Sequence, residues 1–258
     1  MNSDDLDTGK SIGKGQPANR KAGSKLIRPI FQFLVVVAMI VVLILLIWPT
    51  IQKIREEANR TESARNLKQI GKAFQGYHDA HGRLPPAAIY DKDGEPLYSW
   101  RVLLLPFLGE EDLYSQFKLD EAWDGPTNKP LLAKMPLVYA HPTEGKPKEP
   151  YGTYYQVFTG PGAIFEVGPE KRPLTLGQIE AADGTGYTLL VAEAPEPIPW
   201  TKPTDLTYSP DQPLPKLGVP FSHGFLFLMA DGTVHCISWN INETPMRALI
   251  TWNGGENK

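Results

Sequence analysis

FLVVVAMIVVLILLIW, residues 33–48, is an apolar run without a charged residue, a glycine or a proline. Extended back to Ile30, the run contains 19 residues. At about 1.5 Å per residue, a helix of this length spans roughly 28 Å, close to the hydrocarbon thickness of a bilayer. The run therefore predicts a transmembrane helix over residues 30–48 that contacts the lipid bilayer. A cleaved signal peptide is the alternative, but it would have a shorter apolar core followed by small residues, whereas this run ends in Trp48-Pro49-Thr50.

The residues before the run indicate how it would be oriented. Residues 1–29 are polar and rich in Gly, Ser, Asn and Lys, which predicts a disordered tail. Within twenty residues of the run, six basic residues precede it and five follow it, a bias that favours a cytoplasmic N-terminus. We therefore expect a single-pass protein of the cytoplasmic (inner) membrane, with residues 49–258 forming an extracytoplasmic domain.

After the run, residues 49–80 keep a helical pattern. Positions that recur at spacings of three or four would form one packing face: Ile51, Ile54, Ala58, Thr61, Ala64, Leu67, Ile70, Phe74 and Tyr77. A proline can kink a helix without ending it, so we expect one long helix from about Ile30 to Ala80, bent near Pro49. Gly82 and Leu84-Pro85-Pro86 should end it.

Residues 81–258 mix helix and strand signals, which is typical of an α+β domain. We expect short helices over residues 99–108, kinked at Pro106, and over residues 111–117. Strands are expected over residues 151–159 and 187–192, and long proline-rich loops over residues 126–150 and 195–220. A final short helix is expected with Thr244 as its N-cap and Pro245 at its first position.

A β-hairpin is predicted over residues 225–239. Its turn is Ala230-Asp231-Gly232, in which Gly232 supplies the positive φ that a tight turn requires. Asp231 should accept turn hydrogen bonds, and Gly224, just before the hairpin, should permit a close backbone approach.

Composition excludes several functional classes. The 258 residues carry a formal net charge of -3 and contain no basic stripe, which argues against nucleic acid as a partner. The single cysteine, Cys236, excludes an intramolecular disulfide and cysteine-based metal sites built by this chain alone. We expect Cys236 to be a small buried residue, although an exposed thiol there would permit an intermolecular bridge. No phosphate loop and no set of nucleophile, base and stabiliser is present, so neither a cofactor nor an enzymatic activity is predicted.

Two histidines near the end of the long helix form a weak metal-site motif. His78 and His81 are three residues apart, a spacing that can place two imidazoles on one ion. The alternative is that they satisfy groups at the helix end. A metal site would need a third ligand, for which His141, Glu110 or Asp124 are candidates.

Two tryptophans are candidates for ligand contacts. Trp123 and Asp124 lie in an acidic stretch that begins at Glu110, and carboxylates beside an aromatic ring suggest a sugar-binding cleft. The alternative is a solvated face with charges at helix N-termini. Trp200 lies in the second proline-rich segment, where it would either display a ring to a partner or cap the sheet.

Short motifs along the chain resemble a known family. In order they are Leu67-Lys68-Gln69-Ile70-Gly71, Tyr77-His78-Asp79-Ala80-His81-Gly82, Leu84-Pro85-Pro86, Ser99-Trp100-Arg101, Leu119-Asp120-Glu121-Ala122-Trp123-Asp124, Asp183-Gly184-Thr185, Pro199-Trp200-Thr201-Lys202-Pro203 and Ala230-Asp231-Gly232-Thr233-Val234. The stretch from Trp48 to Glu256 thereby resembles the bacterial domain of unknown function 1559 family, which groups with type IV pilin-like and type II secretion pseudopilin-like proteins. The resemblance implies a pilin-like α+β fold, with one long N-terminal helix whose outer half packs on an antiparallel sheet.

The segment before the apolar run departs from that family's pattern. Residues 25–34 lack both the Gly-Phe cleavage pair of a prepilin signal and the glutamate that pilin-like proteins carry inside the apolar segment. We therefore expect a permanently anchored, pilin-like protein with a structural, assembly or interaction role at the cell envelope, through protein partners or self-association. The alternative is an extracytoplasmic ligand- or carbohydrate-binding module that uses Trp123, Asp124 and Trp200.

Overall fold

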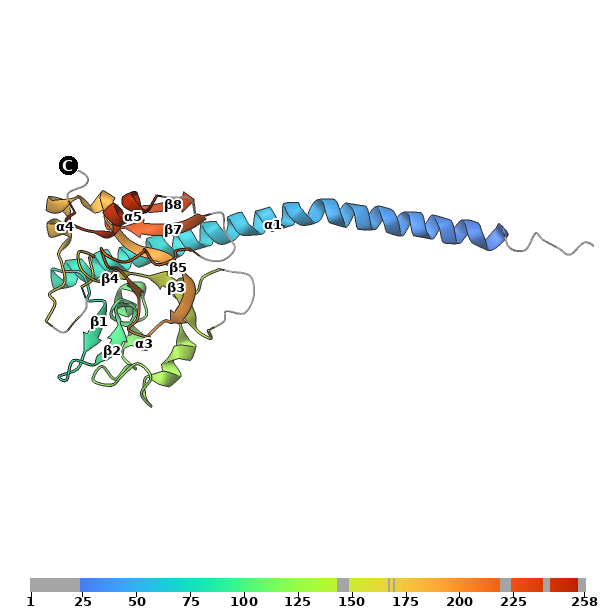
Figure 1. Ribbon diagram of the computed structural model, residues 1–258. Coiled ribbons are helices and arrows are strands. Elements are labelled where there is room, and N and C mark those ends of the chain that lie inside the picture. Colours follow the sequence, from blue (N-terminus) through green and yellow to red (C-terminus); the bar gives the residue numbers. More distant parts are fainter. Residues whose placement is uncertain are drawn as a thin grey trace, which may run out of the picture. The chain divides into compact units, whose positions relative to one another are not determined.

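The computed structural model describes residues 24–142, 149–166, 168, 170–218, 224–238 and 242–254. The chain divides into two compact units between Lys53 and Ile54. One α-helix, α1 (Ser24–His81), contributes to both units (Figure 1). Pro29 and Pro49 both lie inside this helix and neither interrupts it.

In its described part the first unit consists of α1 alone, and the second unit holds the remaining elements. The strands are β1 (Ala88–Tyr90), β2 (Pro96–Ser99), β3 (Gly152–Gln156), β4 (Phe158–Thr159), β5 (Leu189–Pro199), β6 (Leu206–Thr207), β7 (Gly224–Met229) and β8 (Val234–Ser238). The α-helices after α1 are α2 (Trp100–Leu103), α3 (Glu111–Tyr114), α4 (Leu176–Ala182) and α5 (Glu243–Ile250). Short 3-10 helices are η1 (Leu105–Leu108), η2 (Lys129–Lys134), η3 (Leu137–Tyr139) and η4 (Thr185–Tyr187).

The main sheet of the second unit is antiparallel and has the strand order β3-β5-β7-β8. Two smaller pairs accompany it, an antiparallel β1-β2 pair and a parallel β4-β6 pair. With the long N-terminal helix, this arrangement confirms the predicted α+β class.

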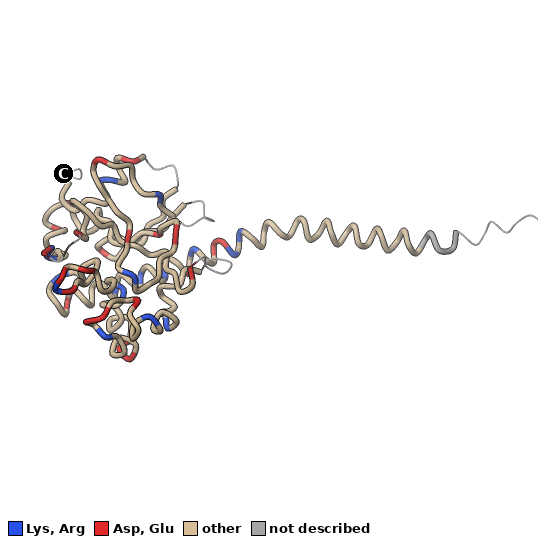
Figure 2. The backbone as a smooth tube through the Cα atoms, turned by 60° about the horizontal axis from the view of Figure 1, so that its bottom comes forward, with Lys and Arg blue, Asp and Glu red and all other residues tan. Residues whose placement is uncertain are grey.

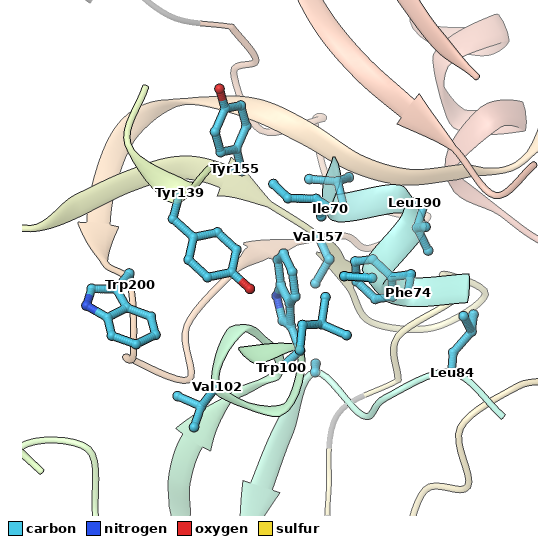
Figure 3. Close-up of a cluster of buried hydrophobic side chains, with 14 of the residues drawn as sticks. Ile70, Phe74, Leu84, Trp100, Val102, Tyr139, Tyr155, Val157, Leu190 and Trp200 are labelled. Carbon is cyan, nitrogen blue, oxygen red and sulfur yellow. The ribbon is translucent and has the colours of Figure 1, made fainter. Parts of the chain in front are cut away.

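Both faces of the main sheet are covered, which explains why β7 is buried along its whole length. Leu226 and Leu228 belong to the same core cluster as Leu67, Ile70 and Phe74 of α1. Figure 3 shows the α1 side of this core. The alternate β7 positions Phe225, Phe227 and Met229 belong to a second cluster with Met246 and Ile250 of α5. Successive strand residues face opposite sides of a sheet, so β7 supplies both layers.

The hairpin follows the expected pattern in its described part. Gly224 pairs with Ser238 at its open end, and Gly232 has a φ of 85° in its turn. The Asp231 carboxylate accepts hydrogen bonds from the backbone N–H and the hydroxyl of Thr233, at 2.8 and 2.7 Å. Trp239, the predicted end of the second strand, lies outside the described residues.

Three expectations about element boundaries were wrong. The helix expected over residues 99–108 is split into α2 and η1, because Pro106 cannot donate the next α-helical hydrogen bond. The helix expected over residues 111–117 ends at Tyr114. The final helix begins at Glu243 with Asn242 as its N-cap, so Pro245 occupies its third position, where a missing N–H still costs no helical hydrogen bond.

The expected loop over residues 195–220 was also wrong at its start, because β5 continues as a strand to Pro199. Beyond Ala192, β5 pairs with β3 but no longer with β7, which leaves one side of the strand without a ladder partner. The backbone N–H of Trp200 donates to Tyr151 O at 3.2 Å, so it points toward the segment that carries β3. Because the backbone groups of successive strand residues point to opposite sides, the backbone nitrogen of Pro199 points away from β3. A proline is compatible with such an edge because its missing N–H has no partner to lose.

Candidate functional site

The apolar run of α1 is exposed along its whole length. Between Ile30 and Trp48, large apolar side chains retain between 39% and 68% of their accessible surface. The helix has a mean hydropathy of 3.3 over its most apolar 18-residue window, none of which is buried. Figure 2 shows that the described backbone carries no Lys, Arg, Asp or Glu over this stretch, and that charged residues begin at its end. A helix of this length and composition can cross a membrane.

A buried polar cluster joins α1 to the main sheet of the second unit. At its centre is Glu193 of β5, whose Oε1 accepts hydrogen bonds from the Ser63 hydroxyl of α1 and from His141 Nε2, the latter at 2.8 Å. The other carboxylate oxygen accepts the backbone N–H of Leu226 at 2.8 Å. The Ser63 hydroxyl also lies 2.9 Å from Tyr155 Oη. One carboxylate thus links α1, β5 and β7, and the Ser63 hydroxyl extends the cluster to Tyr155 of β3.

The geometry of this Glu193 cluster favours a structural role over catalysis. Ser63 and His141 bond to the same oxygen of Glu193 and not to each other, so the imidazole is not placed to deprotonate the hydroxyl. Ser63 is only 1% exposed. Burial raises the pKa of Tyr155, which keeps its phenol neutral and available for hydrogen bonding near neutral pH.

A second buried group centres on Arg101 of α2. Its guanidinium donates to Tyr155 O at 2.7 and 3.1 Å, to the Ser99 hydroxyl at 2.7 Å and to the Asp205 carboxylate at 2.6 Å. The same carboxylate oxygen accepts the Val157 N–H at 3.0 Å and the Trp100 indole N–H at 3.3 Å. Burial raises the pKa of Asp205, while Arg101 and these hydrogen bonds oppose that rise.

The two histidines of the metal hypothesis are engaged by the protein at the end of α1. His78 Nε2 accepts the Leu176 N–H at 3.3 Å, and the His81 ring stacks on Tyr77 with ring centroids 4.1 Å apart. Within the described ranges, no three His, Cys, Asp or Glu side chains come together as a metal site. The proposed third ligand His141 instead bonds to Glu193.

The acidic stretch around Trp123 is divided among separate local roles. Glu111 and Asp112 occupy the first turn of α3, and Glu121 accepts the Thr127 N–H at 2.7 Å, which lowers its pKa. Asp124 is exposed. The Trp123 ring is partly buried against the core, with Lys202 Nζ 6.0 Å from its centroid.

For Trp200, the alternative of a displayed ring was wrong, and for Cys236 the expectation of burial was wrong. Trp200 is completely buried and its indole N–H donates to Leu132 O at 3.1 Å, so it cannot present its ring to a sugar or a partner. It packs between Tyr139 and Phe117, as Figure 3 shows for Tyr139, and thereby completes the core beside the sheet. Cys236 is exposed instead of buried, because β8 is the outer strand of the main sheet.

A cavity of about 120 Å³ lies in the second unit. Four segments line it: residues 84–88 and Tyr90 after α1, residues 163–166 and Gly168 after β4, residues 171–174 before α4, and Trp252 after α5. Hydrogen bonds hold these segments together, from Leu84 N–H to Leu174 O at 2.9 Å and from Trp252 N–H to Gly162 O at 3.1 Å. None of the candidate site residues predicted from the sequence lines this cavity.

These features define an α+β protein whose described residues include one apolar helix that is long enough to cross a membrane. Residues 52–178, just under half of the chain, match the model of a family described as "Protein of unknown function (DUF1559)". The segment holds the second half of α1, Arg101, His141 and Tyr155, whereas Glu193, Asp205 and Trp252 lie beyond it. No curated protein and no solved structure matches the chain.

Proposed function

We propose that this protein is a permanently anchored, single-pass membrane protein with a cytoplasmic N-terminus and a pilin-like ectodomain. Its proposed role is non-enzymatic, in structure or assembly at the cell envelope. The observation that carries the proposal is the continuity of α1. One helix contains the exposed apolar run at residues 30–48 and also the core residues Leu67, Ile70 and Phe74.

The same continuity supports a retained anchor over a cleaved signal peptide. Signal cleavage follows an apolar core through a short segment that ends in small residues. Here the apolar run passes through Trp48-Pro49-Thr50 while remaining helical. The segment before the run also lacks the Gly-Phe pair at which a prepilin would be processed.

The exposed face of α1 supports an assembly role. Between Ile54 and Glu62 most side chains are exposed, and they are mainly charged or polar, with Ile54 and Ala58 as the apolar members. Ile54 retains 63% of its accessible surface. This face is where a protein partner or a second copy would contact the helix.

Anchoring is tested by expressing the full chain in bacterial cells and washing the membranes at alkaline pH. Arginines at the centre of the apolar run each oppose insertion by about 2.5–3.5 kcal/mol. The double substitution Val41→Arg and Leu45→Arg should therefore shift protein from the membrane pellet to the wash. Ile54→Arg with Ala58→Arg is the matched control, because it places the same spacing and charge just beyond the run.

Topology and processing are measured in the same cells by external protease and intact-mass analysis. We expect the N-terminal tail to be protected and intact and residues 49–258 to be accessible. A mature chain that begins near Ile30 or after Trp48 would contradict permanent anchoring.

The assembly role is tested by placing a photo-crosslinking residue at Glu57, on the exposed face of α1. We expect a defined adduct in intact cells, and mass spectrometry would show whether it contains a second copy or another protein. The same probe at Leu137, an 86% exposed residue on η3, is the control. Equal or absent crosslinking at both positions would contradict assembly through α1.

A further inference from the structure

Apolar side chains form part of the walls of the 120 Å³ cavity. Pro85, Ala88 and Ile164 contribute buried surface to it. An apolar protein cavity of about 150 Å³ accommodates benzene, so a cavity of this size matches one six-membered ring. Prolines and backbone hydrogen bonds hold the lining segments, which favours a site formed before any ligand arrives.

Two aromatic residues at this cavity carry hydrogen-bond donors that have no acceptor among the described residues. Tyr90 Oη accepts the Gly168 N–H at 3.2 Å, which leaves its own proton for another acceptor. In the described part of the chain, the Trp252 indole N–H meets no acceptor. An indole N–H is only a donor, so it also calls for an acceptor on the ligand.

One cation at the cavity is uncompensated. Lys171 pairs with Glu166 at 2.7 Å, and these two lining charges cancel. Arg172 also lines the cavity and is exposed, and no ion pair or hydrogen bond joins its side chain to the described residues. A guanidinium group matches the planar, two-oxygen geometry of a carboxylate.

From this arrangement we propose that the cavity binds a small ligand made of one ring and one carboxylate. The ring occupies the space beside Pro85 and Ile164, and the carboxylate accepts hydrogen bonds from Arg172 and from Tyr90 or Trp252. An aromatic acid and an acidic sugar share this chemistry. The site is independent of the membrane anchor, so either proposal can fail without the other.

The test uses the full-length chain in detergent micelles, with binding followed by calorimetry and by ligand-observed NMR. The probes are benzoate with its neutral counterpart benzamide, and D-glucuronate with neutral D-glucose. We expect saturable binding of one of the two acids and at least about tenfold weaker binding of its neutral counterpart. Whether benzoate or glucuronate binds distinguishes an aromatic acid from an acidic sugar.

Variants assign the binding to the cavity. Arg172→Gln should weaken the acid about tenfold and leave the neutral probe unchanged, while Trp252→Phe should weaken the acid and keep most of the packing. Arg60→Gln, which removes an exposed arginine of α1 distant from the lining residues in sequence, should change nothing. The proposal is overturned if neither acid saturates, or if the preference for the acid survives Arg172→Gln in a protein with an unchanged melting temperature.

Discussion

Arg101 and Asp205 form an ion pair with almost no exposed side-chain surface, 0% and 1% respectively. Removing a charge from water is costly, and the cost is offset here because the guanidinium has three acceptors and the carboxylate oxygen has three donors. The pair fixes α2 against β3 and the segment before β6. This contact explains why Arg101, in the short motif Ser99-Trp100-Arg101, is buried in the core although it is charged.

Removing one member of this pair should destabilise the fold strongly. Arg101→Met leaves the Asp205 carboxylate buried without its counter-charge, and we expect a loss of about 3–5 kcal/mol in the free energy of unfolding. Adding Asp205→Asn removes the stranded charge, so the double variant should lose less than the sum of the single variants. Urea denaturation in detergent measures both.

The control for this cycle is Arg65→Met, which removes an exposed ion pair with Glu62. It should cost less than about 1 kcal/mol. Additive losses from Arg101→Met and Asp205→Asn would mean that the two groups do not act as a pair.

At the scale of elements, the β7-β8 hairpin uses two glycines for different reasons. A Cβ at Gly224 would lie 2.3 Å from Ile237 O across the strand pair, whereas a Cβ at Gly232 would meet no atom within 4 Å. Gly232 is needed only for its φ of 85°. The first glycine is required by packing and the second by backbone conformation.

Alanine substitutions should separate these two requirements. Gly232→Ala should cost about 1 kcal/mol, the strain of a left-handed alanine. Gly224→Ala should cost about 3 kcal/mol, because the strands must move apart. Thermal melting of the two variants shows which substitution destabilises the protein more. An equal loss of stability would contradict the close approach at Gly224.

The turn after α4 should make stability depend on pH. The Glu180 carboxylate accepts hydrogen bonds from the N–H and the hydroxyl of Thr185, at 2.8 and 2.7 Å, and these bonds lower its pKa. A carboxyl whose pKa is lower in the folded state adds stability above its unfolded pKa, and that stability disappears as the pH falls through the folded value.

Glu180→Gln should therefore lower the melting temperature more at pH 7 than near pH 3, because the contribution of the ionised carboxylate declines as the pH falls toward its lowered folded-state pKa. Glu57→Gln is the control, because it removes an exposed carboxylate that accepts no hydrogen bond in the described structure. An equal loss for Glu180→Gln at both pH values would contradict the role of the ionised carboxylate.

At the scale of the whole molecule, the contribution of α1 to the second unit begins well after the apolar run. Ser63 is its first buried residue, followed by Leu67, Ile70 and Phe74 in the core. The residues before Ile54 belong to the other compact unit. The apolar run is therefore not needed for the core of the second unit.

Two truncated chains test this division. Residues 49–258 should be soluble without detergent and should unfold cooperatively. Residues 72–258 should not fold, because they lack Leu67 and Ile70, each of which contributes about 2–5 kcal/mol to a packed core. Far-ultraviolet circular dichroism with thermal melting distinguishes the outcomes, and aggregation of the 49–258 chain would contradict the division.

The sequence by itself determined the main secondary-structure elements and the fold class of this protein. The apolar run, the helical spacing through Tyr77 and the hairpin around Gly232 are local patterns, because each depends on residues that are close in the chain. These patterns predicted the long helix, the α+β class and the turn. The ordered motifs predicted the family.

Only the tertiary structure decided the polar clusters, the cavity and the exposure of the aromatic candidates. Ser63 and Glu193 are 130 residues apart, and Arg101 and Asp205 are 104 apart, so no spacing rule links them. Trp123 and Trp200 have the same side chain, yet only Trp200 is completely enclosed by the core. The burial of a side chain depends on which segments pack around it. The folded chain decides this packing, and the residues next to the side chain in sequence do not.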